Sequence, residues 1–292
     1  MIRRVLFAVA LCMNLVVSRL YASDLDEIKA RGVLRHIGIP YANFVTGSGD
    51  GMDVELIKMF SKYIGVKYEY VQSDWGTVIQ DLIGRKIRLA SGSIEYLENV
   101  PIKGDMVANG FTILPWRTQT VEFAQPIFPS QIWLIARADS SVRPIKPTGS
   151  LQKDIALTKA MMRGRTVLTM SKTCLDPELY DLAATGADII CRIGNLNEMA
   201  PALLNKESEL TILDVPDALI ALEKWKGRLK IIGPISEKQL MAAAFPKESP
   251  KLLQAYNAFL RKVQHDGSYL ALLKKYYPTA TSYFPEFFRG MK

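Results

Sequence analysis

Apolar and polar positions alternate in blocks along the chain after its first two dozen residues. Val33–Ile39 is a short apolar run typical of a strand, and Asp53–Ile64 carries apolar residues at helical spacing. Val66–Val71 alternates apolar and polar positions, Asp74–Ile83 predicts another helix, and Asp105–Ala108 predicts a short buried strand. Because helices and strands alternate, this first unit predicts a mostly parallel sheet flanked by helices.

The same pattern restarts after Pro126, which indicates a second α/β unit. Its strands are expected at Gln131–Ala136, Thr166–Met170, Ile189–Ile193, Leu210–Leu213 and Leu229–Ile232. After it the chain predicts one more strand and two helices, at Met241–Phe245, Pro250–Gln264 and Ser268–Tyr277. Residues 85–104 show no clear period and are interpreted as an irregular insertion in the first unit.

Residues 1–23 have the composition of an export signal. Arg3 and Arg4 give a basic start, an apolar stretch runs from Val5 to Val17, and small residues near Ser23 offer a cleavage region. The alternative is an uncleaved membrane anchor, although the stretch is too short to span a bilayer well. We therefore expect a signal peptide and a periplasmic location.

Charge and histidine content exclude several classes of function. The chain of 292 residues has 37 Lys+Arg against 29 Asp+Glu, and three of the arginines lie in the expected signal, so the remaining excess is small and scattered. This balance does not indicate a nucleic-acid partner. His36 and His265 are the only histidines, too few for a histidine-based metal site or a Ser-His-Asp triad. No cofactor is expected.

Cysteine usage agrees with export. Cys174 and Cys191 are the two cysteines outside the expected signal, and each lies near a neighbouring predicted strand of the second unit. An even pair in an oxidising compartment favours one disulfide. Two buried free thiols are the alternative, because spacing alone does not bring the two Cα atoms together.

Polar side chains at strand ends are the first candidates for ligand binding. Thr112 and Arg117 follow a buried strand, at the edge where open α/β sheets bind ligands. Arg117 is able to hold a carboxylate through two hydrogen bonds, or it is a solvated helix residue. Asp214 closes one strand and opens a helix, so it either caps that helix or holds an ammonium group.

Two further features have equally open interpretations. Ser171–Cys174, between a strand and a helix, offers hydroxyls and backbone N–H groups as an anion cradle, or forms a plain turn. Tyr41 follows the first strand and Trp75 begins a helix at the same predicted sheet edge. These rings are either a platform for a ligand or part of the core.

Together these segments resemble the bacterial extracellular solute-binding proteins of family 3. The most specific segments are Gly110-Phe-Thr-Ile-Leu-Pro-Trp-Arg117 and Val121-Glu-Phe-Ala-Gln-Pro126, with Gly51-Met-Asp-Val-Glu-Leu56 and Ala243-Ala-Phe-Pro-Lys247 matching elsewhere. The resemblance covers nearly the whole mature chain. It implies a two-lobed type II periplasmic binding fold with a ligand cleft between the lobes.

The resemblance also implies lobe boundaries and roles for individual residues. The first lobe is expected to comprise residues 24–128 and 237–292, and the second lobe residues 129–236. The implied ligand contacts are the α-carboxylate on Arg117 and Thr173, the α-ammonium on Asp214, further contacts from Thr112 and the backbone at Gly110, and a side-chain sandwich between Tyr41 and Trp75.

The predicted function is capture of a small zwitterion, a neutral, polar or aromatic amino acid, for a membrane ABC permease. We expect a monomer, and a binding protein rather than an enzyme. One alternative is an enzyme on the same scaffold that resembles a cyclohexadienyl dehydratase, with Glu95, Glu98 or Lys172 as its acid or base. A ligand-sensing or accessory protein for a separate receptor is the other.

Overall fold

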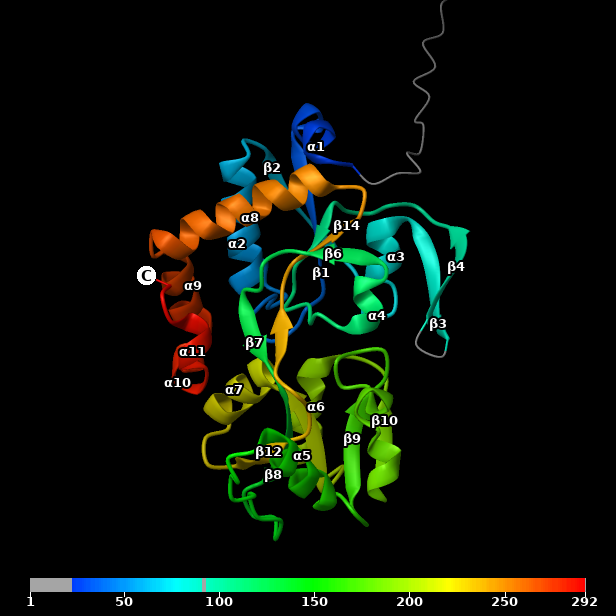
Figure 1. Cartoon of the computed structure of the whole chain (residues 1–292), viewed down its shortest axis with the longest axis vertical. Helices are drawn as coiled ribbons and strands as arrows, with labels where there is room; N and C mark the ends of the chain where they lie inside the picture. The colour runs from blue at the N-terminus through cyan, green and yellow to red at the C-terminus, as the bar shows by residue number, and fades with distance from the viewer. Residues whose placement is uncertain (1–22, 91–92, 292) are drawn as a thin grey trace, which may run out of the picture.

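Two five-stranded sheets, each flanked by helices, form two lobes stacked along the long axis of the molecule (Figure 1). The computed structural model describes residues 23–90 and 93–291. Apart from Ser23, the predicted signal peptide therefore lies outside the described residues. Within them, every helix is too short or too polar to cross a membrane.

The first sheet has the strand order β2-β1-β5-β14-β6. Its strands are β1 (Val33–Gly38), β2 (Lys67–Gln72), β5 (Met106–Val107), β6 (Val121–Phe123) and β14 (Ala244–Pro246). β1 runs parallel to β2 and β5, whereas β14 is antiparallel to β5 and β6. The helices of this lobe are α1 (Leu25–Arg31), α2 (Met52–Tyr63), α3 (Val78–Ile83), α4 (Pro115–Thr118), α8 (Pro250–His265) and α9 (Ser268–Tyr276).

The second sheet repeats this mixture of parallel and antiparallel pairs in the order β10-β9-β11-β8-β12. Its strands are β8 (Ile132–Arg137), β9 (Thr166–Met170), β10 (Asp188–Arg192), β11 (Leu210–Asp214) and β12 (Leu229–Pro234). β9 is parallel to β10 and β11, and β8 is antiparallel to β11 and β12. Helices α5 (Leu151–Ala160), α6 (Met199–Leu204) and α7 (Val215–Lys224) flank it. The predicted α/β class is confirmed.

Two short antiparallel strands carry the chain between the lobes. β7 (Phe128–Ser130) pairs with β13 (Gln239–Met241). The strand expected at 241–245 is divided between β13 and β14, because the chain leaves one ladder and joins another within a few residues. The lobe boundaries at 128/129 and 236/237 stay a prediction.

Residues 85–104 contain a β-hairpin, so the prediction that this segment is irregular is wrong, whereas its being an insertion stays a prediction. β3 (Arg85–Ala90) and β4 (Ser93–Asn99) pair antiparallel and lie at the side of the first lobe next to α3 (Figure 1). Arg88 forms an ion pair with Glu95 across the strands, with 2.6 Å between nitrogen and oxygen. Ile87 and Leu89 alternate with charged residues on β3, as Ile94 and Tyr96 do on β4, and they pair across the hairpin. This short alternation was the available signal for two strands.

A C-terminal strap, residues 280–288, packs against both lobes. It contains α10 (Ala280–Tyr283) and α11 (Pro285–Phe288). The Phe284 ring lies nearly parallel to that of Trp133 in β8, with 6.4 Å between ring centroids. Phe288 packs against Phe128 in β7, at 6.2 Å between centroids. The strap therefore joins the end of the first lobe to the second sheet.

We expect Phe284→Ala to lower the free energy of unfolding by about 3 kcal/mol, because the ring is 4% exposed and its removal leaves a cavity. Tyr283→Ala is the matched control, since the ring of Tyr283 also contacts Trp133 but is 46% exposed. Its expected loss is below about 1 kcal/mol. Urea unfolding measures both, and equal losses would contradict an anchoring role for Phe284.

Candidate functional site

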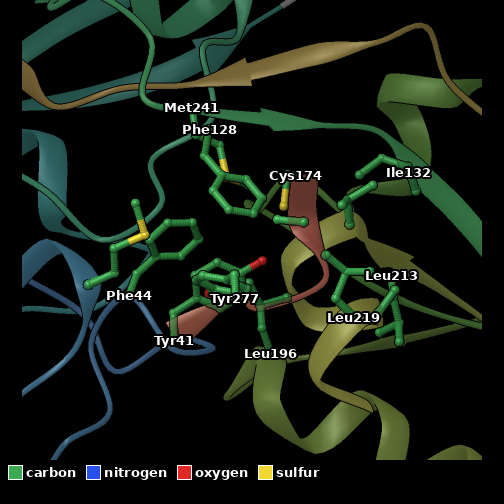
Figure 2. Close-up of a cluster of buried hydrophobic side chains, with 14 of the residues drawn as sticks. Tyr41, Phe44, Phe128, Ile132, Cys174, Leu196, Leu213, Leu219, Met241 and Tyr277 are labelled. Carbon is green, nitrogen blue, oxygen red and sulfur yellow. The ribbon is translucent and has the colours of Figure 1, made fainter. Parts of the chain in front are cut away.

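The two lobes close onto each other through a buried cluster of side chains (Figure 2). From the first lobe and its connecting strands come Tyr41, Phe44, Phe128, Met241 and Tyr277, and from the second come Ile132, Cys174, Leu196, Leu213 and Leu219. All ten are 5% exposed or less. The predicted ligand residues lie around this cluster.

Tyr41 and Asp214 make a direct contact between the lobes. The Tyr41 hydroxyl, in the turn after β1, donates a hydrogen bond to Asp214 Oδ1. The Cys174 thiol donates to Asp214 Oδ2 at 3.2 Å. Each lobe therefore contributes one neutral donor, and the two donors bond to different oxygens of this buried carboxylate.

Asp214 occupies the N-cap position of α7 without using its side chain as the cap. Its backbone is extended, as N-caps require, but its carboxylate accepts no cap hydrogen bond. Burial raises the pKa of the carboxyl, and the hydrogen bonds from Tyr41 and Cys174 act in the opposite direction. A group between the lobes that reaches this carboxylate must therefore share or replace a hydrogen bond from Tyr41 or Cys174.

Arg117 supplies a buried positive charge on the first lobe. It lies in α4, is 1% exposed, and its Nη1 donates to the Thr112 carbonyl at 2.9 Å. The guanidinium carbon lies 4.0 Å from the centroid of the Phe111 ring and 5.9 Å from that of Trp75. Burial lowers its pKa to about 10, so it stays protonated at neutral pH.

The charges of Arg117 and Asp214 both act on the Cys174 thiol, which is buried near each of them. Burial raises the pKa of this thiol, Asp214 raises it further, and Arg117 lowers it. In the described part of the chain Arg117 has no ion pair, and its Nε has no hydrogen-bond partner. Arg117, a cation without an anionic partner, and Asp214, a carboxylate bound by neutral donors, therefore lie in one buried site around Cys174.

Gly110 shapes the first-lobe side of the site through its backbone. Its φ is +65°, and an added Cβ would lie 2.3 Å from Phe44 Cδ2, so only glycine fits. Its N–H donates to Asp53 Oδ2 at 2.7 Å. Asp53 lies in the first turn of α2, where Gly51 holds the N-cap position. Burial raises the pKa of Asp53 to about 7.

Thr173 is buried, but its hydroxyl serves its own turn. It donates to the Met170 carbonyl at 2.8 Å and accepts from the Leu175 N–H at 3.0 Å. Thr112, also buried, contributes its carbonyl to Arg117. The structure thus places both threonines beside the site, with Thr173 stabilising the turn that carries Cys174.

Tyr41 and Trp75 lie together without forming a parallel sandwich. Their ring centroids are 5.6 Å apart and the planes meet at 80°. Trp75 lies nearly parallel to Phe111 instead, at 6.4 Å between centroids. Its indole Nε1 is buried and has no partner among the described residues. Trp75 and Phe111 thus make an aromatic wall beside Arg117.

The predicted disulfide is wrong, because Cys174 and Cys191 are both free. Cys174 is buried and faces Asp214, whereas Cys191 is exposed on β10 with its sulfur 2.9 Å from Ser171 Oγ. The two cysteines follow or occupy neighbouring strands, as expected. The turn after β9, however, directs Cys174 toward the other lobe.

The acids and the base nominated for an enzyme do not line this site. Glu95, Glu98 and Lys172 are exposed, and both glutamates pair with hairpin cations. Sequence analysis instead missed Cys174 as a site residue, and Tyr180, whose hydroxyl donates to the Cys174 carbonyl at 2.6 Å. The position of Cys174 directly after Thr173, within the predicted cradle, was the available signal.

Comparison with known sequences identifies a family and a longer relative. The sequence model of bacterial extracellular solute-binding proteins, family 3, matches residues 102–279. The chain is 26% identical over 277 residues to membrane-bound lytic murein transglycosylase F of Pseudomonas putida (strain W619). This match covers 93% of the chain and 52% of the relative, so the chain spans about half the length of that protein.

Solved structures share the fold at low sequence identity. A mutant of ArgBP from T. maritima has a TM-score of 0.67 at 24% identity, covering 87% of this chain and 99% of that one. The ancestral amino acid-binding protein AncCDT-1, a precursor of cyclohexadienyl dehydratase, has a TM-score of 0.64 at 22% identity, covering 87% and 98%. The substrate binding protein of an amino acid ABC transporter has a TM-score of 0.62 at 18% identity, covering 85% and 100%. These likenesses confirm the predicted type II periplasmic binding fold.

Asp53 makes the stability of the fold depend on pH. Its folded pKa of about 7 lies above the ordinary 3.8, so its contribution is full below about pH 4 and is lost as pH rises toward 7. Asp53→Asn keeps an acceptor for the Gly110 N–H and removes the ionisation. Relative to this variant, the wild type should lose on the order of 4 kcal/mol between pH 4 and 8. Urea unfolding at both pH values measures this, and parallel pH profiles would refute it.

Proposed function

Because the chain belongs to the bacterial extracellular solute-binding proteins of family 3, we propose that it binds an amino acid between its lobes and delivers it to a membrane ABC permease. One observation carries the proposal. Arg117 is a buried cation without an anionic partner in the described chain, and Asp214 is a buried carboxylate held only by neutral donors. A zwitterion supplies the missing group at each of them.

The ligand α-carboxylate pairs with Arg117. The Nε of Arg117, which has no partner among the described residues, donates a hydrogen bond to that carboxylate. The α-ammonium pairs with Asp214, where it shares or replaces the hydrogen bond from Tyr41. Arg117 lies in the first lobe and Asp214 ends β11 of the second. A ligand that contacts both therefore favours the closed form through its higher affinity for that form.

Arg117 and Asp214 together are called the clamp. The surroundings of the clamp favour a neutral, polar or aromatic side chain on the ligand. Trp75 and Phe111 form the wall beside Arg117, and the Trp75 indole N–H is free to donate to a polar group. The similar structure from an amino acid ABC transporter supports this class of ligand and partner. A periplasmic location and a monomeric state complete the proposal.

An enzyme is the second candidate, favoured by the environment of Asp214. Its buried carboxyl has a raised pKa and contacts two groups able to exchange protons, Tyr41 and Cys174. The likeness to a precursor of cyclohexadienyl dehydratase points to the same alternative. Turnover of a cyclohexadienyl substrate that Asp214→Asn abolishes would favour the enzyme, whereas binding without turnover favours the transport protein.

The clamp is tested by a thermal-shift screen of the mature protein against the amino acids, followed by calorimetry on the best ligand. Arg117→Ala and Asp214→Asn should each weaken binding by about 2 to 5 kcal/mol, the cost of leaving one member of a buried charge pair unpaired. Arg88→Ala, which removes an exposed hairpin arginine, is the control and should bind as the wild type does. Unchanged affinity in either clamp variant removes that residue from the site.

A further inference from the structure

A hollow of about 170 Å³ lies between the β1–α2 loop of the first lobe and helices α6 and α7 of the second. Ala42 and Asn43 line it from the first lobe, and Asn197, Asp217 and Trp225 line it from the second. None of the predicted ligand contacts borders it. The hollow is therefore distinct from the clamp between Arg117 and Asp214.

Among the residues that the structure describes, Asp217 is the only acid that lines this hollow. Its side chain belongs to the first turn of α7, and the residue is 7% exposed. Within the part of the chain that the structure describes, its carboxylate has no hydrogen bond and no ion pair. Burial and the charge of nearby Asp214 raise its pKa well above the ordinary range. A buried carboxyl with no partner is costly unless another group compensates it.

The other walls suit an organic cation. Ile220 and Ala221 supply apolar surface and Trp225 an indole ring, while Asn43 from the first lobe and Asn197 from the second bring amide groups. The ammonium of Lys224, which is exposed at the rim, lies 4.8 Å from the centroid of the Trp225 ring and forms no ion pair with Asp217.

Other ligand classes fit the hollow less well. An anion would meet the carboxylate of Asp217. The described residues contain no group of three or more acidic, His or Cys side chains able to hold a metal ion. The volume is below the roughly 300 to 1,000 Å³ typical of sites for drug-sized molecules.

We propose that this hollow is a second binding site, for the protonated primary amine of a small organic cation, with Asp217 as the counter-ion and Trp225 as the wall. Both lobes line the site, so it is complete only when they are closed. A bound amine therefore stabilises the closed form. By linkage, the amine raises the affinity of the clamp for the amino acid, and the amino acid raises the affinity of the hollow for the amine by the same factor.

The test uses the mature protein and n-butylammonium chloride as the probe, with sodium chloride at equal ionic strength and n-butanol as matched controls. The melting temperature of the wild type should rise with butylammonium concentration and not with either control. Asp217→Asn should weaken the apparent affinity at least tenfold. Asp214→Asn, which removes the carboxylate that holds an ammonium in the clamp, should respond as the wild type does, which separates this site from the clamp.

A second variant covers the case in which Asp217→Asn does not fold. Ile220→Trp fills the hollow from a half-buried position and should likewise abolish the response while circular dichroism stays native. An equal response of the wild type and both variants overturns the proposal, as does a wild type that responds to n-butanol as strongly as to the amine. Loss of the response in Asp214→Asn also overturns it, because the amine then binds at the ammonium end of the clamp.

Discussion

Closure of the two lobes buries opposite charges without letting them neutralise one another. Removing an arginine and an aspartate from water costs several kcal/mol for each ion, which a direct ion pair only partly offsets. Here Arg117 is compensated by a carbonyl and aromatic faces, and Asp214 by a hydroxyl and a thiol. Neutral groups thus stabilise the interface, and both charges remain able to bind a ligand.

Three buried acids at the starts of α2 and α7 have different roles near this interface. Asp53 holds the Gly110 turn within the first lobe, so its role is to fix the backbone before Thr112 and Arg117. Asp214 joins the lobes through neutral donors. Asp217, one helical turn further along α7, has no hydrogen bond or ion pair to its carboxylate within residues 23–90 and 93–291. Burial raises the pKa of all three, yet only their partners distinguish a structural acid from one open to a ligand.

Hydrophobic periodicity predicted the strands and helices that pack against a core, and it did not predict the exposed hairpin. The strand expected at Thr166–Met170 coincides with β9, and the one at Ile189–Ile193 differs from β10 by a single residue. The hairpin at 85–99 was missed because its alternation is short, with Ile87 and Leu89 opposite Tyr96 and Ile94, and lies between the exposed charge pairs Lys86–Glu98 and Arg88–Glu95. The residues around the clamp were found as strand ends. Their partners were not, because hydrogen bonds such as that between Tyr41 and Asp214 join segments far apart in the chain.

The position of β14 decides the order in which the lobes are completed. Every strand of the second sheet comes from the continuous segment 132–234, whereas the first sheet needs β14, whose Ala244 pairs with Val107 and Phe123. Contacts between distant segments form slowly, because a long loop must close before they contribute stability. The second lobe therefore finishes first as the chain emerges, and the first lobe waits as an incomplete sheet with β5 and β6 lacking the strand between them. During that interval this open edge is the part of the protein most exposed to misassembly.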